Sequence, residues 1–473
     1  MSIPAARLTD FANVFSGALV TPDHPDYDEV RKVHNGFVDK RPALIARCRG
    51  VADVQAAVNF ARTNNIPISV RGGGHNVSGR ALIEGGMVID LSLMKGVLVD
   101  PRTRTARAQG GVTWGEFNRE TQVYGLATTG GVVSSTGIAG LTLGGGLGFL
   151  QGKYGMAVDN LRSVELVTAD GKAVTATADE HPDLFWALRG GGGNFGVATS
   201  LEYDLHPVGP MIHGGAVFHP FSAARDVLRF YREVTANVPD ELSVFAGLLH
   251  APDGSGAKLV GLVAGYCGPD AEAEAVLRPL KTFGPPAMDM LGPIPYSQLN
   301  MLLDASLPRG TRNYWKSSFL SELTDDAIDA LVDRYAAVTS PMSQLVIEHF
   351  HGAVSRVAPD ATAFPHRTPG YNFVMISQWT DPLEDQRHVA WTRETFAALQ
   401  PFARDARYVN YLDHDDASQS AAAYGDNYAR LQQVKAKYDP DNFFRQNLNI
   451  RPAEEPTARR SETGIAAHGD AAI

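Results

Sequence analysis

The stretch that decides the fold is residues 69–79, Ser-Val-Arg-Gly-Gly-Gly-His-Asn-Val-Ser-Gly. The run before the glycines, residues 66–70, is rich in β-branched residues and predicts a strand that ends at them. Free backbone N–H groups at a strand end form a nest that binds phosphate or pyrophosphate. Because three glycines let a ligand lie against the main chain, His75 is expected to touch that ligand. A tight turn with a structural histidine is the alternative that this segment alone leaves open.

Composition and charge exclude several classes of protein. The chain has 473 residues, which favours two domains, and a formal net charge of -10 without a long basic run. This balance argues against nucleic acid or a membrane surface as a partner. Cys48 and Cys267 lie far apart and outside metal-ligand spacing, so neither a metal site nor a disulfide framework is expected. The N-terminus lacks a secretory signal and no stretch reaches membrane-spanning length, which indicates a cytoplasmic protein.

The hydrophobic pattern predicts an α+β fold. A strand–helix–strand unit is expected at residues 44–47, 51–63 and 66–70, followed by strands at 87–91, 97–100 and 105–108 and a helix at 113–124. Helical stretches at 223–238 and 325–338 alternate with strands and indicate a second domain, in which residues 345–352 and 371–379 predict sheet strands. On the first of these two strands, a period of two places Ile347, His349 and His351 on one face.

Two further glycine clusters follow the opening segment. Residues 130–148 contain too much glycine for a regular element, and their apolar residues favour burial against a ligand. Residues 190–196 contain G-x-G-x-x-G at Gly191, Gly193 and Gly196, but they follow an expected helix at 182–189. Because the dinucleotide fingerprint follows a strand and opens a helix, a nicotinamide-binding Rossmann domain is not supported.

Together with the C-terminal run 438–444, Tyr-Asp-Pro-Asp-Asn-Phe-Phe, these segments resemble the berberine bridge enzyme-like family, and residues 149–155 and 447–450 resemble its bacterial branch. The family belongs to the vanillyl-alcohol oxidase or p-cresol methylhydroxylase superfamily. The resemblance implies an FAD-binding domain of the p-cresol methylhydroxylase type, made of residues 1–206 and a returning segment, 404–452. It places an α+β substrate domain at residues 207–403, with a β-sheet over the flavin. Residues 453–473 are expected to form a disordered tail.

The resemblance implies that FAD binds the glycine-rich segments. His75 falls on the histidine that relatives bond covalently to the 8α-methyl group of the isoalloxazine. Relatives with a second covalent bond carry a cysteine where this chain has Val133, so a single attachment through His75 is implied. Leu141 replaces a histidine of many relatives, which leaves open what contacts the pyrimidine side of the flavin. The expected FAD-binding residues are Arg71, Gly72, Gly73, Gly74, His75, Asn76, Gly79, Gly130, Gly137, Gly140, Leu141, Gly144, Gly145, Gly148, Val197, Asn447 and Asn449.

The resemblance also implies a catalytic base. In the family, the second tyrosine of a Y-x-N-Y pattern has this role, and it matches Tyr411. Because the pKa of a free tyrosine is about 10, neighbours that lower it are expected, and a tyrosine packed on the core is the alternative. Asn372 stands where some relatives carry a catalytic glutamate, so that carboxylate is expected to be absent. Tyr408, Asn372, His349 and Gln378 complete the expected catalytic set, with His349 and Gln378 in the substrate pocket or, for His349, as a structural residue.

These features imply an FAD-linked oxidase. A hydride is expected to pass from a carbinol or amine carbon of a small organic substrate to flavin N5, while Tyr411 or a neighbour removes the proton. Molecular oxygen is the expected acceptor, with hydrogen peroxide as the product. Two alternatives are a dehydrogenase with another acceptor and a flavin-binding protein without turnover. The missing secretory signal favours an alkaloid or small alcohol over a sugar, and the sequence identifies neither the substrate nor the oligomeric state.

Overall fold

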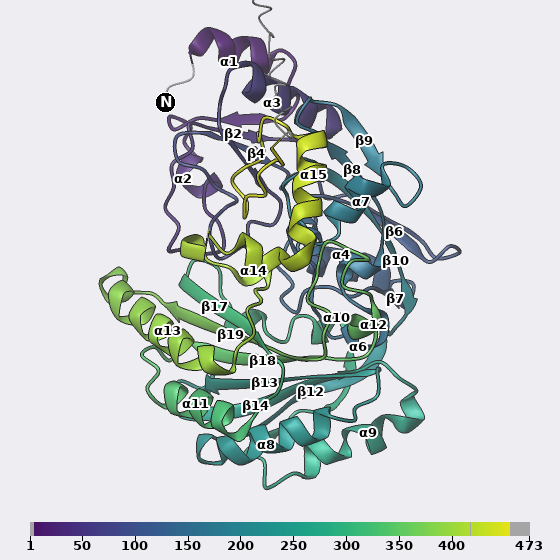
Figure 1. The fold of residues 1–473 in the computed structure, drawn as a ribbon, viewed down its shortest axis with the longest axis vertical. Helices are drawn as coiled ribbons and strands as arrows, with labels where there is room; N and C mark the ends of the chain where they lie inside the picture. The colour runs from purple at the N-terminus through teal and green to yellow at the C-terminus, as the bar shows by residue number, and fades with distance from the viewer. Residues whose placement is uncertain (1–3, 417, 455–473) are drawn as a thin grey trace, which may run out of the picture.

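The computed structural model describes residues 4–416 and 418–454, in which two sheet-containing parts are built from one chain (Figure 1). Strands β1 to β11 form the first part and β12 to β19 form the second. The chain then returns to the first part through α14 (Ser420–Tyr424) and α15 (Tyr428–Tyr438). This mixture of helices and sheets confirms the predicted α+β class. The predicted domain boundaries stay a prediction, and most of the predicted tail, residues 455–473, lies outside the described residues.

The first part contains two main sheets. The first has the order β1 (Ala18–Val20), β2 (Leu44–Arg47), β4 (Met87–Asp90), β3 (Ile68–Arg71), and its last three strands are parallel. The second is antiparallel, with the order β5 (Val97–Asp100), β6 (Thr105–Gln109), β10 (Val197–Asp204), β8 (Leu161–Val167), β9 (Ala173–Ala176). A short pair joins β7 (Leu126–Ala127) to β11 (His206–Pro207). The strands predicted between residues 44 and 108 are therefore confirmed, with small shifts at their ends.

The helices predicted at residues 51–63, 113–124 and 182–189 are present in the first part, and four further helices among the described residues were not predicted. The helices of this part are α1 (Ala5–Ala12), α2 (Tyr27–Val30), α3 (Val51–Thr63), α4 (Trp114–Gln122), α5 (Ile138–Leu143), α6 (Gln151–Tyr154) and α7 (Pro182–Leu188). The expectation that residues 130–148 contain no regular element is wrong, because α5 lies within them. Ile138, Thr142 and Leu143 bury one side of α5, and this burial offsets the cost of about 1 kcal/mol that an internal glycine brings to a helix.

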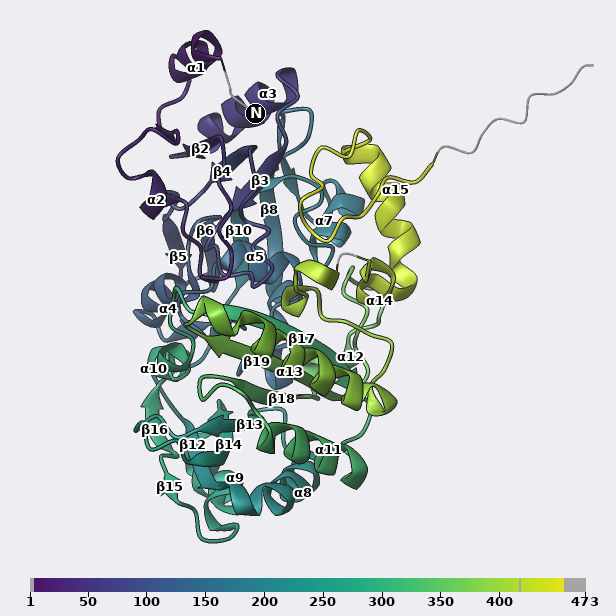
Figure 2. The ribbon, with the colours of Figure 1, turned by 90° about the vertical axis from the view of Figure 1, so that its left-hand side faces the viewer.

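The second part is one large antiparallel sheet whose longer helices cover one face (Figure 2). The strand order is β15 (Met288–Asp289), β12 (Met211–Pro220), β14 (Lys258–Tyr266), β13 (Leu242–His250), β18 (Gln344–Phe350), β19 (Gly370–Trp379), β17 (Arg312–Leu320), and β16 (Gly292–Pro295) pairs with β12. The helices are α8 (Ala224–Thr235), α9 (Asp270–Thr282), α10 (Tyr296–Leu299), α11 (Asp325–Ala336), α12 (Ala353–Arg356) and α13 (Asp385–Leu399). The helices and strands predicted for this region are confirmed.

Alternation along the strands decides which side chains meet the helices. Leu345 and Ile347 of β18 and Phe373 and Met375 of β19 belong to the core shared with the helices α8, α11 and α13. Their neighbours in the sequence therefore point to the opposite face of the sheet. That face looks toward the first part of the molecule (Figure 2).

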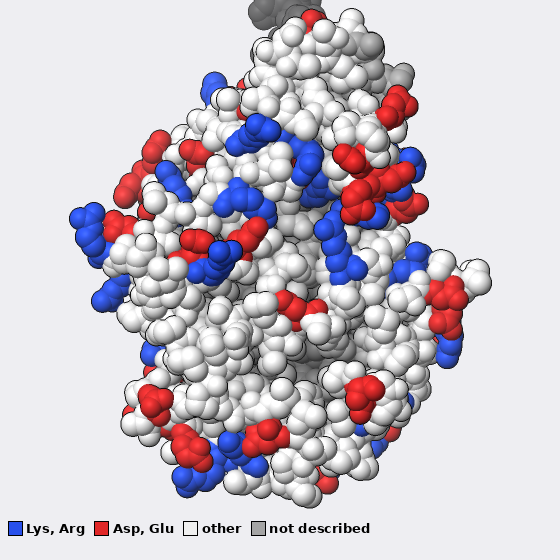
Figure 3. All heavy atoms as spheres, turned by 180° about the vertical axis from the view of Figure 1, so that it is seen from behind, with Lys and Arg blue, Asp and Glu red and all other residues white. Residues whose placement is uncertain are grey.

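The surface carries charges of both signs. Figure 3 shows Lys and Arg side chains interspersed with Asp and Glu side chains over one face of the molecule. Within residues 4–416 and 418–454, no helix combines the length and the apolar character that a membrane crossing requires.

A buried lysine anchors the returning C-terminal segment. The Lys435 side chain is fully buried, and its Nζ donates to Asn194 O at 2.7 Å, to Phe444 O at 2.9 Å and to the Asp439 carboxylate at 2.5 Å. The same carboxylate accepts the N–H groups of Phe443 and Phe444. The run 438–444 that carried part of the resemblance is therefore an anchor of the C-terminal segment on the first part.

We expect Lys435→Met to lower the free energy of unfolding by about 3 to 5 kcal/mol, because it leaves the Asp439 carboxylate buried without its cation. Urea unfolding followed by circular dichroism measures this change. Lys437→Met is the matched control, because the Lys437 side chain is 60% exposed in its ion pair with Asp183, and it should change stability by no more than about 0.5 kcal/mol. Equal effects of the two substitutions would contradict the anchoring role.

Candidate active site

A large cavity lies between the first part and the free face of the large sheet. Including its mouth toward solvent, the space without atoms measures about 1910 Å³. Its lining combines glycine-rich segments of the first part, residues of β17, β18 and β19, and the segment around Tyr411. Many of the site residues predicted from distant parts of the sequence therefore meet in one place.

Glycines form a narrow wall on one side of this cavity. A Cβ added to Gly73 would lie 2.5 Å from Gly137 N, and one added to Gly137 would lie 2.4 Å from Gly73 N. Gly74 has a φ of +66°, a conformation that favours glycine. A Cβ on Gly140 would meet nothing within 4 Å. The main chains at Gly73 and Gly137 thus lie in contact without intervening side chains. A ligand can therefore approach the backbone of this wall closely.

His75 presents a free nitrogen at this wall. Its Nε2 is buried and has no hydrogen-bond partner among the described residues, and its ring stacks on His34 with centroids 3.9 Å apart. Burial lowers the pKa of His75 to about 3, so the imidazole is neutral at ordinary pH. A buried polar atom without a partner normally indicates a missing ligand or water. His75 is therefore suited to contact, or to bond with, a group in the cavity.

An acid and a tyrosine form the polar centre of the opposite side. The Tyr411 hydroxyl donates to Glu348 Oε1 at 2.8 Å, and Asn372 Nδ2 donates to Glu348 Oε2 at 2.6 Å. Glu348 and Asn372 are cross-strand partners on β18 and β19. Glu348 is only 4% exposed, and burial raises its pKa to about 7. This carboxyl can therefore change its protonation state near neutral pH.

The resemblance implied that a carboxylate base is absent at the position of Asn372, and the structure adds a carboxylate beside it, because Glu348 is its partner one strand away. One expectation about the base is wrong. The pKa of Tyr411 was expected to be lowered, but burial raises it well above its usual range, and the Glu348 charge raises it further. The neighbours of Tyr411 are an acid and a tyrosine, so nothing here favours an ionised Tyr411 at neutral pH.

The Y-x-N-Y segment is tied to the glycine wall. Tyr408 Oη accepts from Gly146 N and from Asn410 Nδ2, both at 2.9 Å, and Asn410 Nδ2 also donates to Leu141 O at 2.9 Å. Tyr408 lines the cavity, and its ring lies edge-on to that of Tyr411, with centroids 4.7 Å apart. Tyr408 and Asn410 thereby hold Tyr411 at a fixed distance from the wall.

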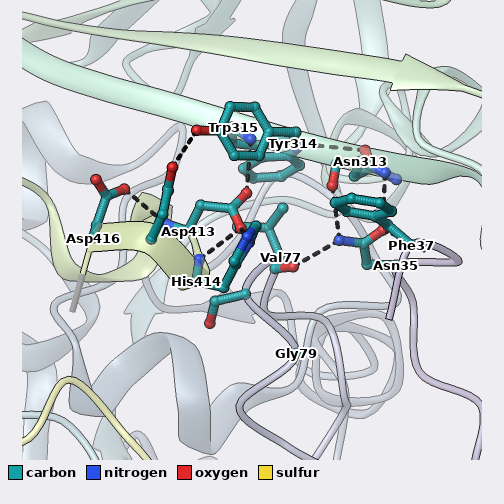
Figure 4. A network of polar contacts seen from close by, with 12 residues as sticks. Asn35, Phe37, Val77, Gly79, Asn313, Tyr314, Trp315, Asp413, His414 and Asp416 are labelled. Atoms are coloured by element: carbon teal, nitrogen blue, oxygen red, sulfur yellow. Dashed lines mark hydrogen bonds and ion pairs between the residues drawn. The ribbon is translucent and has the colours of Figure 1, made fainter. Parts of the chain in front are cut away.

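A second polar network closes the edge strand β17 (Figure 4). Asn35 Nδ2 donates to Asn313 O at 2.9 Å, while Asn313 N donates to Asn35 Oδ1 at 2.8 Å. Trp315 N donates to Asp413 Oδ2 at 2.9 Å. These bonds occupy backbone groups that an edge strand would leave open. They also hold Trp315 in the cavity wall. Asn35 of the first part binds the backbone of Asn313, two residues before Trp315, and Asp413 of the C-terminal segment binds the backbone of Trp315 itself.

Some residues expected to bind FAD line the cavity and others do not. Those in the lining are Gly72, Gly73, Gly74, His75, Asn76, Gly137, Gly140, Leu141 and Asn447. The structure gives several of the others a packing role. A Cβ on Gly130 would lie 2.3 Å from the Trp114 ring, and one on Gly148 would lie 1.9 Å from Gly130 O. Arg71 pairs instead with Asp90 at 2.6 Å. Outside the lining lie Arg71, Gly79, Gly130, Gly144, Gly145, Gly148, Val197 and Asn449.

Three expected catalytic residues also lie outside the lining, namely Asn372, His349 and Gln378. The His349 ring points away from Glu348 and stacks on His351, with centroids 4.6 Å apart. This follows from strand alternation, since His349 and Glu348 are neighbours on β18. Gln378 is fully buried and donates from Nε2 to Ser306 O at 3.0 Å, so it supports a wall segment without lining it.

Three features of the cavity were missed by sequence reasoning. Glu348 was passed over because period two drew attention to the histidines on the other face of β18. Its signal was an acid alone in a β-rich run. Gly192, Gly193 and Gly196 line the cavity although their cluster is no dinucleotide fingerprint. Arg80 lines the cavity as well, with Nε donating to Ser78 Oγ at 3.0 Å.

The position of Val133 agrees with the absence of a thiol at the wall. Val133 lines the cavity, is 6% exposed and packs with Val77 and Trp315. Cys48 is buried in the core around α3, and Cys267 packs in a cluster near Phe149, so neither lines the cavity. His75 is thus the nucleophilic side chain that the lining offers on this side.

The glycine wall, the free His75 nitrogen and the acid–tyrosine pair across from them are suited to a flavin cofactor, and comparisons with known proteins define the class. Residues 42–177 match the family described as FAD binding domain, and residues 407–451 match the family described as Berberine and berberine like. The protein is an FAD-linked oxidoreductase with a p-cresol methylhydroxylase-type FAD-binding fold.

Similar proteins cover nearly the whole chain. The FAD-linked oxidoreductase DDB_G0289697 of Dictyostelium discoideum is 30% identical, over 94% of this chain and 97% of its own length. The (R)-6-hydroxynicotine oxidase of Paenarthrobacter nicotinovorans is 32% identical, over 92% and 97% respectively. The crystal structure of 6-hydroxy-D-nicotine oxidase from Arthrobacter nicotinovorans superposes with a TM-score of 0.84 at 30% identity, covering 93% of this chain and 98% of that one. The chain belongs to the berberine bridge enzyme-like family.

Proposed function

We propose that this enzyme holds FAD through a single covalent bond to His75 and oxidises a carbinol or amine carbon of a small organic molecule, with oxygen as the final acceptor and hydrogen peroxide as the product. The observation that carries this proposal is the 2.8 Å hydrogen bond from Tyr411 to Glu348 inside the cavity. Bound FAD supplies the acceptor for the hydride. The protein supplies binding, orientation and the path of the proton.

The residues that would hold FAD fit its chemistry. Gly72 to Gly74 offer backbone N–H groups without side chains, which suits the pyrophosphate. Gly193 and Asn447 line the same cavity and are joined by a bond of 2.6 Å from Asn447 Nδ2 to Gly193 O. His75 supports covalent attachment because its Nε2 is neutral, buried and without a partner among the described residues.

Tyr411 and Glu348 divide the work of a base. Because the Tyr411 hydroxyl donates to Glu348, the free lone pair of its oxygen can accept a proton from the substrate. The proton of Tyr411 then passes to the Glu348 carboxylate, which explains why a tyrosine with a raised pKa can still take part. Asn372 Nδ2 holds the second oxygen of that carboxylate. Glu348, with its pKa of about 7, is the terminal proton acceptor.

The oxygen acceptor has its own test. The name of one relative supports it, because the 6-hydroxynicotine oxidase that is similar in sequence and in structure is called an oxidase. We expect that enzyme reduced under anaerobic conditions recovers its yellow colour rapidly in air-saturated buffer and forms hydrogen peroxide in equal amount. Slow recovery that a quinone accelerates would assign the protein as a dehydrogenase.

We expect Tyr411→Phe to slow flavin reduction by about 10²-fold or more, because the proton loses its bridge to Glu348. Stopped-flow absorbance with a carbinol that bleaches the wild-type flavin measures this rate. Tyr154→Phe is the control, because the Tyr154 ring stacks on His206 outside the cavity lining, and it should leave the rate unchanged. An unaltered rate in Tyr411→Phe would remove the central support of the proposal.

A further inference from the structure

The half of the cavity that faces the large sheet has a distinct chemistry. We propose that its substrate is an apolar, ring-containing carbinol whose hydroxyl lies on the carbon that is oxidised. This assignment rests on the proposed oxidation at the same site. It excludes carbohydrates and favours alcohols over amines.

Apolar side chains dominate the walls of this half. Trp315 on β17, Val346 on β18, and Val374 and Ile376 on β19 line it, together with Leu307 and Phe245. Trp315, Val374, Ile376 and Leu307 form one buried cluster with Val133. The alternation of strands explains this set, because β17, β18 and β19 each turn every second residue toward the cavity. Such walls bind an apolar body and give no partner to additional hydroxyl groups.

Most donor groups of the polar side chains in this half already have partners. Trp315 Nε1 donates to Asn313 Oδ1 at 3.1 Å. Gln344 Nε2 donates to Ser306 O at 3.1 Å, and Ser306 Oγ donates to Leu303 O at 2.8 Å. Glu348 receives a donor on each of its oxygens. The acceptor lone pair of Tyr411 Oη stays available at the polar centre of this half, where it matches one substrate donor.

The charge distribution favours a hydroxyl over an ammonium group. Glu348 is the ionisable acid of this half, and each of its two oxygens already accepts one hydrogen bond. Arg80 lies on the first part and bonds Ser78 Oγ at 3.0 Å and Asp413 O at 3.5 Å. An ammonium group would bring three donors and a charge into walls of valine, isoleucine and tryptophan, where burial of an unpaired donor is costly. A carbinol brings one donor, which Tyr411 can accept.

The reaction balances with the groups present. The O–H bond of the carbinol breaks, and its proton goes to Tyr411 Oη while the proton of Tyr411 moves to the Glu348 carboxylate. The C–H bond breaks, and its hydrogen leaves with the electron pair to the bound FAD. A carbonyl group forms at the same carbon. The carbinol is oxidised by two electrons and FAD is reduced by two.

The test mixes the flavin-loaded enzyme under anaerobic conditions with five probes: 1-phenylethanol, cyclohexanol, 1-phenylethylamine, D-glucose and cellobiose. Flavin absorbance records bleaching, and the difference spectrum before bleaching records binding. We expect 1-phenylethanol to be oxidised with a kcat/KM at least about 100-fold above that for either sugar, and above that for 1-phenylethylamine.

Each outcome separates the substrate class from the proposed function. If a sugar or the amine bleaches the flavin faster than 1-phenylethanol does, the proposed substrate class is overturned, whereas the proposed oxidation stands. Spectral binding of the two alcohols without bleaching contradicts the proposed function and supports the apolar ligand class. No binding of either alcohol overturns the substrate class.

Two wall variants sharpen the test. Val374→Thr keeps the shape of the wall but adds a hydroxyl, and it should lower the affinity for 1-phenylethanol about 10-fold at unchanged flavin content. Val276→Thr, on the outer helix α9, is the matched control and should bind like the wild type. If Val374→Thr fails to fold, Ile376→Val removes one methyl group from the same wall and should weaken binding less. Wild-type affinity in both wall variants overturns the proposal.

Discussion

Replacement of Glu348 by glutamine should slow flavin reduction by about 10² to 10⁴-fold, the usual contribution of a positioned base. Glutamine keeps the size of the side chain but cannot take the proton that Tyr411 passes on. Rapid mixing with 1-phenylethanol, or with the carbinol that bleaches the wild-type flavin fastest, measures the rate. Glu394→Gln, at an exposed position of α13, is the matched control and should react like the wild type.

The same variant should change the pH profile. Because the ionised carboxylate accepts the proton, the rate of the wild type should rise with pH through a midpoint of about 7. Below that midpoint Glu348 is protonated and the relay stops. In Glu348→Gln this inflection should be missing. If Glu348 had a merely structural role, the substitution would lower the rate but the inflection in the pH profile would remain. A wild-type inflection in the variant would contradict the assignment of Glu348.

Stability gives a second readout that needs no substrate. Burial raises the pKa of Glu348 from its ordinary value of 4.5 to about 7, so the folded state favours the protonated form. Its stabilising contribution is therefore full below pH 4.5 and is lost as the pH rises through about 7. Glu348→Gln should gain stability relative to the wild type between these values, which urea unfolding at pH 5 and pH 8 can measure. If the difference in the free energy of unfolding between the variant and the wild type is the same at pH 5 and pH 8, Glu348 is not a buried acid with a raised pKa.

The second large effect is expected for His75→Ala. Wild-type flavin should stay with the chain after acid precipitation, whereas the flavin of the variant should appear in the supernatant. The reason is that the variant lacks the buried, unpaired Nε2 at the glycine wall. A fluorescent band on a denaturing gel provides the same information, present in the wild type and missing in the variant.

His213→Ala is the control for this experiment. His213 lies on β12 and pairs with Asp270 at 2.6 Å, and it should retain the covalent flavin. Flavin that stays on the chain in His75→Ala would place the bond at another residue. Complete release of the flavin from the wild-type chain would rule out covalent attachment. It would not contradict the binding of FAD.

Much of the fold was predictable because local patterns determine it. The apolar period of α3 and the β-rich runs of β18 and β19 lie where the sequence placed them. The helix α5 was missed because glycine suggested irregular structure, whereas tertiary burial of Ile138 and Leu143 stabilises it. Local propensity is a weak guide where packing supplies the stability.

Short motifs with their own chemistry were enough to predict the family and to place His75 and Tyr411 in the cavity. The pairing of Glu348 with Tyr411, on which the proposed proton acceptor rests, became visible in the three-dimensional structure. Strand pairing sets Glu348 against Asn372, and the second part folds over the first so that this pair is buried beside Tyr411. Burial then raises the pKa of both groups, which is why we propose the acid as the acceptor and the tyrosine as the bridge. The opening segment, residues 69–79, retains its meaning as the wall that carries His75 and its free nitrogen.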